Sequence, residues 1–237
     1  MKIGLALGGG AARGYAHFGV LFALEKSSIP IHCIAGTSIG AAVGGLWATY
    51  QLIDCYQALK KLTPAKVREM LDPELPLFSG FIKGEKLYET LESWFKGYQI
   101  ENLTKEFCAN AVNLSTGKEE TFHSGNLADV IRASVSVPVI LAPWYISNQP
   151  FVDGGVINPL PVRQCREMGA DIVIAVNLLG VVPKVSSKDE TKNEVLEKAK
   201  RFHLPENILD AVNEIPLLHQ LRNPKIPETA FASVLLT

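Results

Sequence analysis

The first 52 residues contain one pattern twice: a short apolar run, a glycine-containing turn and a helix-like apolar segment. The first copy has the run Ile3–Leu7, the loop Gly8–Gly14 and a helix expected over Tyr15–Lys26. The second has the run Ile31–Ala35 and a helix expected over Ala41–Leu52. Parallel neighbouring strands need crossover connections of this kind, so the pattern predicts an α/β fold with a mainly parallel sheet.

Apolar periodicity and turn residues predict the rest of the organisation. Asp54–Phe95 is helical with proline interruptions, which leaves open a lid-like excursion or a layer of helices. Pro183–Asn207 is charged and polar, as expected of a solvated helix or loop. The remaining expected elements are a hairpin of Phe107–Leu114 and Glu119–Phe122, a helix over Leu127–Ala133 capped by Asn126, and a strand over Ile172–Leu178.

Charge and cysteine usage exclude several classes of function. Lys plus Arg number 23 and Asp plus Glu 24, so no excess charge attracts nucleic acid or anionic lipid. The four cysteines form no C-x-x-C pair, which argues against a zinc site or a disulfide framework and predicts buried, reduced thiols. With neither a signal-peptide pattern nor an apolar run long enough to span a membrane, we expect a cytoplasmic protein.

Ser38 is the strongest indication of chemistry. It is the centre of Gly36-Thr37-Ser38-Ile39-Gly40, a G-x-S-x-G string between an expected strand and an expected helix. This is the nucleophile-elbow pattern, in which a strained turn projects a serine hydroxyl. The structural alternative is a serine that only caps the following helix at a packed turn.

The loop Gly8–Gly14 has the composition of an oxyanion hole. Successive backbone N–H groups at a helix N-terminus can stabilise a negatively charged oxygen. Phosphate binding is disfavoured, because Gly9–Gly14 departs from G-x-G-x-x-G at Ala11 and no Gly-Lys-Ser or Gly-Lys-Thr follows. A glycine turn that serves packing alone is the remaining alternative.

Ser38 also needs a base, and the histidines offer none that is well placed. His203 and His219 alone come late enough for the order Ser, acid, His, yet neither follows a strand in a tight turn. Asp153 lies in Phe151-Val152-Asp153-Gly154-Gly155, where two glycines permit close approach. The structural alternative for Asp153 is a turn residue whose side chain hydrogen-bonds to its own backbone.

Four motifs in order give the chain a resemblance to the patatin-like phospholipases over about residues 1–180. They are the glycine loop Gly8–Gly14, the elbow Gly36–Gly40, the run Ala133–Pro138, and Asp153-Gly154-Gly155-Val156-Ile157-Asn158-Pro159-Leu160-Pro161. The resemblance implies a three-layer α/β/α sandwich and a Ser–Asp dyad without histidine, metal or cofactor.

The resemblance also assigns roles to residues. Ser38 becomes the nucleophile and Asp153 the base. Gly9, Gly10 and Ala11 become the oxyanion hole. The residues that support these motifs are Gly8, Arg13, Gly14, Gly36, Gly40, Gly154 and Gly155. For Arg13 three roles stay open, which are stiffening the loop, meeting a lipid phosphate, or simply starting a helix in solvent.

The chain departs from the family pattern at Ala11 and at its end. The family usually has a glycine where this chain has Ala11, and a methyl group there costs about 1 kcal/mol if φ is positive. The family usually continues into a further strand and helix beyond Thr237. We therefore expect residues 1–237 to form a single domain that is shortened at its C-terminus.

The resulting hypothesis is a lipid acyl hydrolase that acts through an acyl-enzyme, with Asp153 moving the proton in each half-reaction. Its substrate is a lipid or another acyl ester. Transient binding to a membrane surface is left open, and nucleic acid is not a partner. The apolar stretches 75–81 and 137–145 are candidates for an acyl groove, with core packing as the alternative. The rival hypotheses are a non-catalytic regulatory or adaptor protein, suggested by Ala11, and a conventional α/β-hydrolase with a histidine triad.

Overall fold

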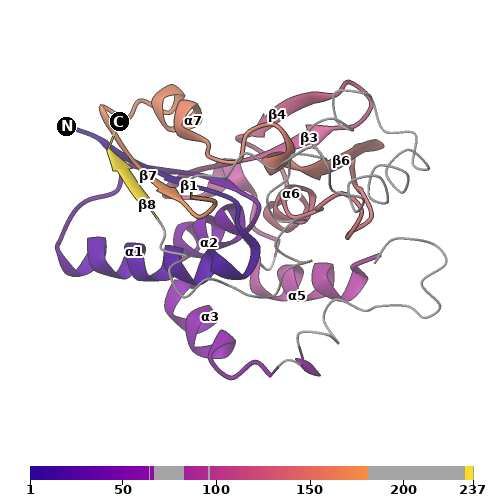
Figure 1. Ribbon diagram of the computed structural model, residues 1–237, viewed down its shortest axis with the longest axis horizontal. Helices are drawn as coiled ribbons and strands as arrows, with labels where there is room; N and C mark the ends of the chain where they lie inside the picture. The colour runs from indigo at the N-terminus through magenta and orange to yellow at the C-terminus, as the bar shows by residue number, and fades with distance from the viewer. Residues whose placement is uncertain (64, 67–82, 96, 181–232, 237) are drawn as a thin grey trace, which may run out of the picture.

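The fold is a three-layer α/β/α arrangement around one mixed sheet (Figure 1). The computed structural model describes residues 1–63, 65–66, 83–95, 97–180 and 233–236. The elements are β1 (Ile3–Leu7), η1 (Ala11–Gly14), α1 (Tyr15–Lys26), β2 (Cys33–Thr37), α2 (Ile39–Ala48), α3 (Leu52–Leu59), α5 (Glu85–Phe95), η3 (Ile100–Asn102), β3 (Glu106–Asn113), β4 (Lys118–Phe122), α6 (Leu127–Ser134), β5 (Trp144–Ile146), β6 (Gln149–Asp153), η4 (Gly154–Val156), α7 (Val162–Glu167), β7 (Ile172–Asn177) and β8 (Ser233–Leu236).

The sheet has a parallel core with antiparallel strands around it. Strands β7, β1, β2 and β3 run parallel, which confirms the expected βαβ units. Strand β8 is antiparallel to β7, β4 and β6 are antiparallel to β3, and β5 is antiparallel to β6. The core strands β1 and β2 are almost wholly buried, as expected of strands covered on both faces.

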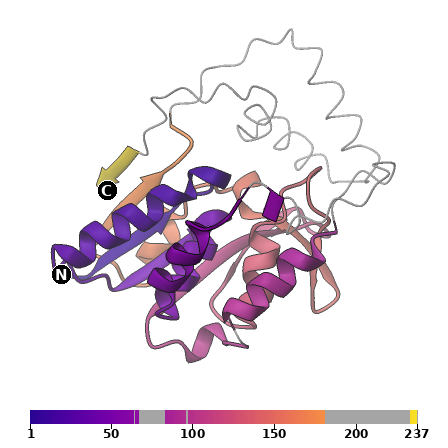
Figure 2. The ribbon, with the colours of Figure 1, turned by 90° about the horizontal axis from the view of Figure 1, so that it is seen from below.

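Helices cover both faces of the sheet, but unequally. Helix α7 packs on β1, β2 and β7 on one face, while α2 and α6 pack on the other. Figure 2 shows α1, α3 and α5 lying on that second side. Of the segment Asp54–Phe95, the described parts in α3 and α5 belong to this helical layer, while 64 and 67–82 lie outside the described residues. The larger hydrophobic core, with Leu5, Phe18, Ile34, Val43 and Ile131, lies between these helices and the sheet.

The predicted boundaries of the second strand–turn–helix unit were wrong. Strand β2 covers Cys33–Thr37 rather than Ile31–Ala35, and α2 starts at Ile39 and ends at Ala48. The backbone stays extended through Gly36 and Thr37, because Thr37 still pairs with Asn110 of β3. The strand therefore carries the chain directly up to Ser38.

Other sequence predictions are confirmed with small shifts. Asn126 caps α6, since its side-chain oxygen accepts the N–H groups of Ala128 and Asp129. All four cysteines are buried with free thiols. Within the described ranges no helix is long and apolar enough to cross a membrane. Pro183–Asn207 and the apolar stretch 75–81 lie outside the described residues.

Candidate active site

The sheet brings Ser38 and Asp153 together along one edge of β3. Strand β2 pairs with β3 up to Thr37 opposite Asn110, and β6 pairs with β3 up to Asp153 opposite Ala111. Strand β4 pairs with the other edge of β3 from Ala109 to Asn113, which includes the point where β2 and β6 end. Because β2 is parallel and β6 antiparallel to β3, their C-terminal ends meet head to head at consecutive residues of β3.

Ser38 lies on a strained turn between β2 and α2. Its φ of 55° and ψ of −123° are rare for a residue with a side chain and cost about 1–3 kcal/mol. A methyl group at Gly40 would collide with the Leu7 carbonyl, so this position requires glycine. The N–H of Ser38 donates to Ser134 Oγ at 2.9 Å, which holds the turn in place. The geometry is that of a nucleophile elbow.

The side chains of Ser38 and Asp153 are hydrogen-bonded and nearly buried. Ser38 Oγ donates to Asp153 Oδ2 at 2.6 Å, across 115 residues of sequence. The other carboxylate oxygen, Oδ1, accepts the N–H of Gly155 at 2.7 Å. Burial raises the pKa of Asp153 to about 6, although both hydrogen bonds act to lower it. The carboxylate is thus ionised at neutral pH and a stronger base than a solvated aspartate.

The glycine loop is fixed at its start and has unpaired N–H groups at its end. Gly8 N–H donates to the Val176 carbonyl at 3.1 Å, and Gly9 N–H donates to the Pro159 carbonyl at 2.9 Å. The N–H of Gly9 is therefore already engaged in this structure, and the oxyanion role of the loop stays a prediction. The N–H groups of Gly10 and Ala11 meet no acceptor within the part of the chain that the structure describes.

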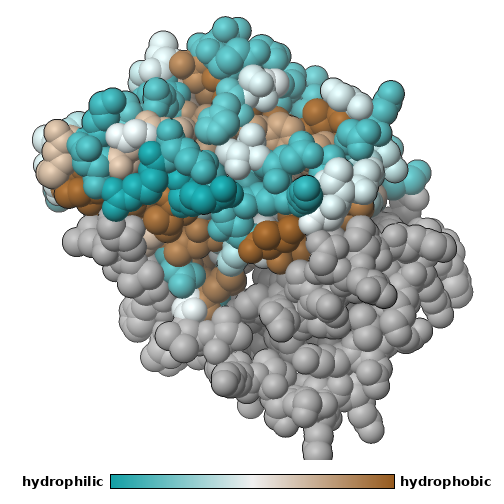
Figure 3. All heavy atoms as spheres, turned by 90° about the horizontal axis from the view of Figure 1, so that it is seen from above, coloured by the Kyte–Doolittle hydropathy of each residue, from teal (hydrophilic) through white to brown (hydrophobic). Residues whose placement is uncertain are grey.

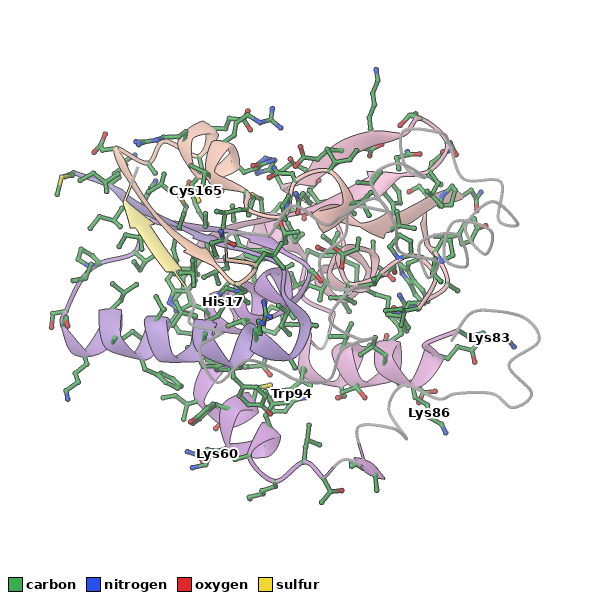
Figure 4. All side chains as sticks on the ribbon, in the orientation of Figure 1. His17, Lys60, Lys83, Lys86, Trp94 and Cys165 are labelled. Carbon is green, nitrogen blue, oxygen red and sulfur yellow. The ribbon has the colours of Figure 1, made fainter. Side chains whose placement is uncertain are left out.

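The side chains of two residues hydrogen-bond to backbone carbonyls at or beside the glycine loop. Arg13 Nη1 donates to the Leu178 carbonyl at 2.8 Å, which favours the stiffening role for this residue. His17 points from the first turn of α1 toward the sheet (Figure 4), and its Nε2 lies 2.8 Å from the Gly8 carbonyl. Burial lowers the pKa of His17 to about 4, so the ring is neutral and its Nε2 carries the proton. Sequence reasoning gave His17 no role.

Ala11 is in the left-handed region that favours glycine. Its φ is 47°, so the methyl group carries the conformational cost anticipated from the sequence. Ala11 lines the cavity beside Ser38 and begins η1, which ends at Gly14. The departure from the family pattern thus lies directly in the site.

A mainly apolar cavity of about 400 Å³ opens beside Ser38. Helix α2 supplies Ala42 and Val43 to its wall, α3 supplies Cys55, and α5 supplies Leu91 and Trp94. Figure 4 shows Trp94 at the end of α5 that lies near α3. Of the two expected groove stretches, 137–145 contributes Val137 to this wall. The cavity has the size and lining of a small-molecule site for an apolar ligand.

The opposite side of the elbow is polar. Thr37 Oγ1 lies 2.7 Å from Asn110 Oδ1 and 3.1 Å from the Asn158 carbonyl. The amides of Asn110 and Asn158 in turn donate to the carboxylate of Glu119, each at 2.8 Å. Sequence reasoning missed this network, for which the one local signal was Asn158 within the motif that starts at Asp153.

Two further glycines of the predicted motifs, Gly154 and Gly36, are needed for close packing. A methyl group on Gly154 would come within 2.5 Å of the Asn110 carbonyl, so the turn after Asp153 needs glycine for close approach to β3. A methyl group on Gly36 would meet Ala41 of α2 at the same distance. His203 and His219, the only candidates for a histidine base, lie outside the described residues.

The sequence comparisons agree with the family resemblance. Residues 5–166 match the family model described as patatin-like phospholipase. An uncharacterized NTE family protein of Mycobacterium tuberculosis is 37% identical over 76% of this chain and 49% of its own length. Lysophospholipase NTE1 of Kluyveromyces lactis is 36% identical over 74% of this chain and 12% of its own length. The chain thus spans about half the length of the mycobacterial relative. VipD from Legionella pneumophila has a TM-score of 0.41 at 14% identity, covering 80% of this chain and 48% of that one.

Proposed function

The chain belongs to the patatin-like phospholipase family, and from this premise we propose that it is a serine hydrolase of lipid acyl esters. The observation that carries the proposal is the 2.6 Å hydrogen bond from Ser38 Oγ to Asp153 Oδ2, on a strained elbow beside an apolar cavity. A regulatory protein without turnover would have no need to retain this strain or this buried carboxylate.

In the first half-reaction, Ser38 Oγ attacks the ester carbonyl while Asp153 takes the hydroxyl proton. The Ser38–Asp153 hydrogen bond already lies along the path of that proton. The raised pKa of Asp153, about 6, brings the base closer to neutral pH, where proton transfer is most effective. Asp153 then returns the proton to the leaving alcohol, and the acyl group stays on Ser38.

The negative charge that develops on the carbonyl oxygen needs preorganised donors. We assign this role to the N–H groups of Gly10 and Ala11, because the N–H of Gly9 is engaged by Pro159. Helix α2 begins at Ile39, so its positive N-terminal end also faces the reacting group. The second half-reaction reverses these steps, with water in place of the alcohol and Asp153 as its base.

The cavity accommodates the acyl part of the substrate. Its wall comes from α1, α2, α3 and α5 and is formed almost wholly by apolar side chains. Burying methylene groups there contributes about 0.8 kcal/mol each, which favours long acyl chains over short ones. The name lysophospholipase, carried by the fungal relatives, suggests lipids with a single acyl chain as the first substrates to test.

The proposal is tested with nitrophenyl esters of graded chain length and with lysophosphatidylcholine, using wild type, Ser38→Ala and Asp153→Ala. We expect each variant to lose at least about 10³-fold in kcat, because nucleophile and base act as a unit. Circular dichroism checks folding, and a His203→Ala/His219→Ala variant serves as the control for a histidine base. Full activity of folded Ser38→Ala, or loss of activity in the histidine variant alone, would contradict the dyad.

A further inference from the structure

Glu119 is a nearly buried carboxylate outside the catalytic pair. It lies on β4, and its side chain is 13% exposed. One oxygen, Oε1, accepts three side-chain amides, from Asn110 and Asn158 at 2.8 Å and from Gln164 at 2.7 Å. The other oxygen, Oε2, faces Arg163 Nη2 at 3.2 Å near the surface. Three convergent donors on one oxygen are more than a surface glutamate needs.

A carboxylate only accepts hydrogen bonds, so it dictates how these amides are turned. With its NH₂ group bound to Glu119, Asn110 must direct Oδ1 away from it, and Oδ1 accepts the Thr37 hydroxyl at 2.7 Å. Asn110 Nδ2 also lies 3.1 Å from the Asn158 carbonyl, so two acceptors, this carbonyl and Glu119, set the orientation of the amide together. Glu119 supplies the shorter of the two contacts and so strengthens the hydrogen-bond orientation up to the residue before Ser38.

The network reaches the other two parts of the site through one short segment. The Asn158 carbonyl lies 3.1 Å from both Thr37 Oγ1 and Asn110 Nδ2, and the next carbonyl, of Pro159, accepts Gly9 N–H at 2.9 Å. This segment follows the turn that carries Asp153. The side-chain amide of Asn158 is itself held by Glu119. Nucleophile strand, base turn and glycine loop are therefore tied to each other through bonds that converge on one carboxylate.

We propose that Glu119 is a positioning residue for the Ser38–Asp153 pair: it acts through Asn110 and Asn158 to hold Thr37 and the base turn in register. The inference rests on the proposed hydrolase function. Glu119 lines none of the acyl cavity, so its effect is on the rate of the chemical step and not on the affinity for the acyl chain.

The test compares Glu119→Ala with Glu119→Gln and with a matched control, Glu120→Ala. The glutamine variant keeps an acceptor oxygen for the three amides and places its NH₂ group toward the exposed Arg163. Glu120 is adjacent on β4 and accepts the Asn113 amide at 2.7 Å, in the hairpin turn rather than in the site. For each variant we would measure kcat and KM on a nitrophenyl ester, the rate at which a fluorophosphonate labels Ser38, and the melting temperature.

We expect Glu119→Ala to lower kcat and the labelling rate about 10- to 100-fold with KM unchanged, as for misplacement of a reacting group by about 1 Å. Glu119→Gln should recover most of this loss, and Glu120→Ala should match wild type in both rates. Thr37→Val should lower the rate as well, and combining it with Glu119→Ala should add little, because both act on one chain of hydrogen bonds.

Three outcomes would overturn the inference. One is a wild-type labelling rate per folded molecule in Glu119→Ala, which would make the network a matter of stability alone. The others are equal losses in Glu119→Ala and Glu119→Gln, or an equal loss in Glu120→Ala. Failure of the hydrolase proposal is recognised separately, because wild type would then show no hydrolysis, or Ser38→Ala would retain it, whatever the Glu119 variants do.

Discussion

The two sides of the elbow differ in how they are built. Toward α2, α3 and α5, Ser38 faces a cavity of apolar side chains. Toward β4 and α7, the neighbouring Thr37 faces a set of amides around Glu119. Figure 3, seen from the α7 side, shows a mainly hydrophilic face with apolar side chains gathered near its lower border.

This difference follows from where the strand ends. Thr37 is the last residue of β2 and its hydroxyl faces the amide network, whereas Ser38 lies on the strained turn that follows, at φ 55°, and lines the cavity. Apolar contacts are non-directional and suit a chain of variable length, whereas hydrogen bonds fix positions. In the proposed function one side supplies binding and the other supplies alignment, and three further predictions address that division.

The largest effect is expected from pH, because Asp153 lies where the two sides meet. The raised pKa, about 6, means that Asp153, the proposed base, is ionised above this value and protonated below it. We expect kcat/KM to be constant above about pH 7 and about 100-fold lower at pH 4, with a midpoint near 6.

This profile is measured with a short-chain ester, with folding monitored at each pH. Wild type and Glu120→Ala should give the same midpoint. A flat profile between pH 5 and pH 8 would show that Asp153 does not act as the base.

The next largest effect is expected from a substitution in the apolar cavity, which should impair acyl-chain binding alone. Ala42 lies on α2, one turn after Ser38, and lines the cavity. Ala42→Phe should fill space that about three methylene groups would use, at about 0.8 kcal/mol each, and lower kcat/KM for a long-chain ester about 50-fold. Hydrolysis of a short-chain ester should be nearly unchanged.

Ala23→Phe, on an exposed position of α1, is the matched control for this substitution. Equal losses on long and short esters in Ala42→Phe would mean that the cavity wall also aligns the reacting groups. The division between the two sides would then not hold.

The smallest effect is expected at Ala11, which lines the cavity and carries one of the proposed oxyanion donors. Ala11→Gly relieves a residue at φ 47°, yet it also frees the unfolded chain. These contributions oppose each other, so the free energy of unfolding should change by less than about 1 kcal/mol. The rate should change no more than a few-fold.

Chemical denaturation and ester hydrolysis measure the two quantities for Ala11→Gly. A rise in kcat of more than about 10-fold would show that the alanine distorts the oxyanion hole. That result would also favour the view that natural selection has relaxed turnover in this chain.

Much of the site could be predicted because its signals are local. Ser38 between two glycines, after a strand and before a helix, is a turn that few other functions require. Asp153 before two glycines was similarly visible, and the motif order linked the two residues. The roles of Arg13 and His17 could not be predicted in this way. Their side chains hydrogen-bond to the carbonyls of Leu178 and Gly8, and no sequence motif indicates these contacts.

By itself the sequence determined the elements and the conformations that depend on neighbouring residues. Hydrophobic periodicity and the steric freedom of glycine act over a few residues, so β1, the elbow and the cap of α6 could be read directly. Only the tertiary structure decided that β2 and β6 end head to head on β3, that Gly9 is engaged by Pro159, and that three amides converge on Glu119. The reason is that strand register and side-chain hydrogen bonds join residues far apart in sequence, and only the packed fold sets those distances.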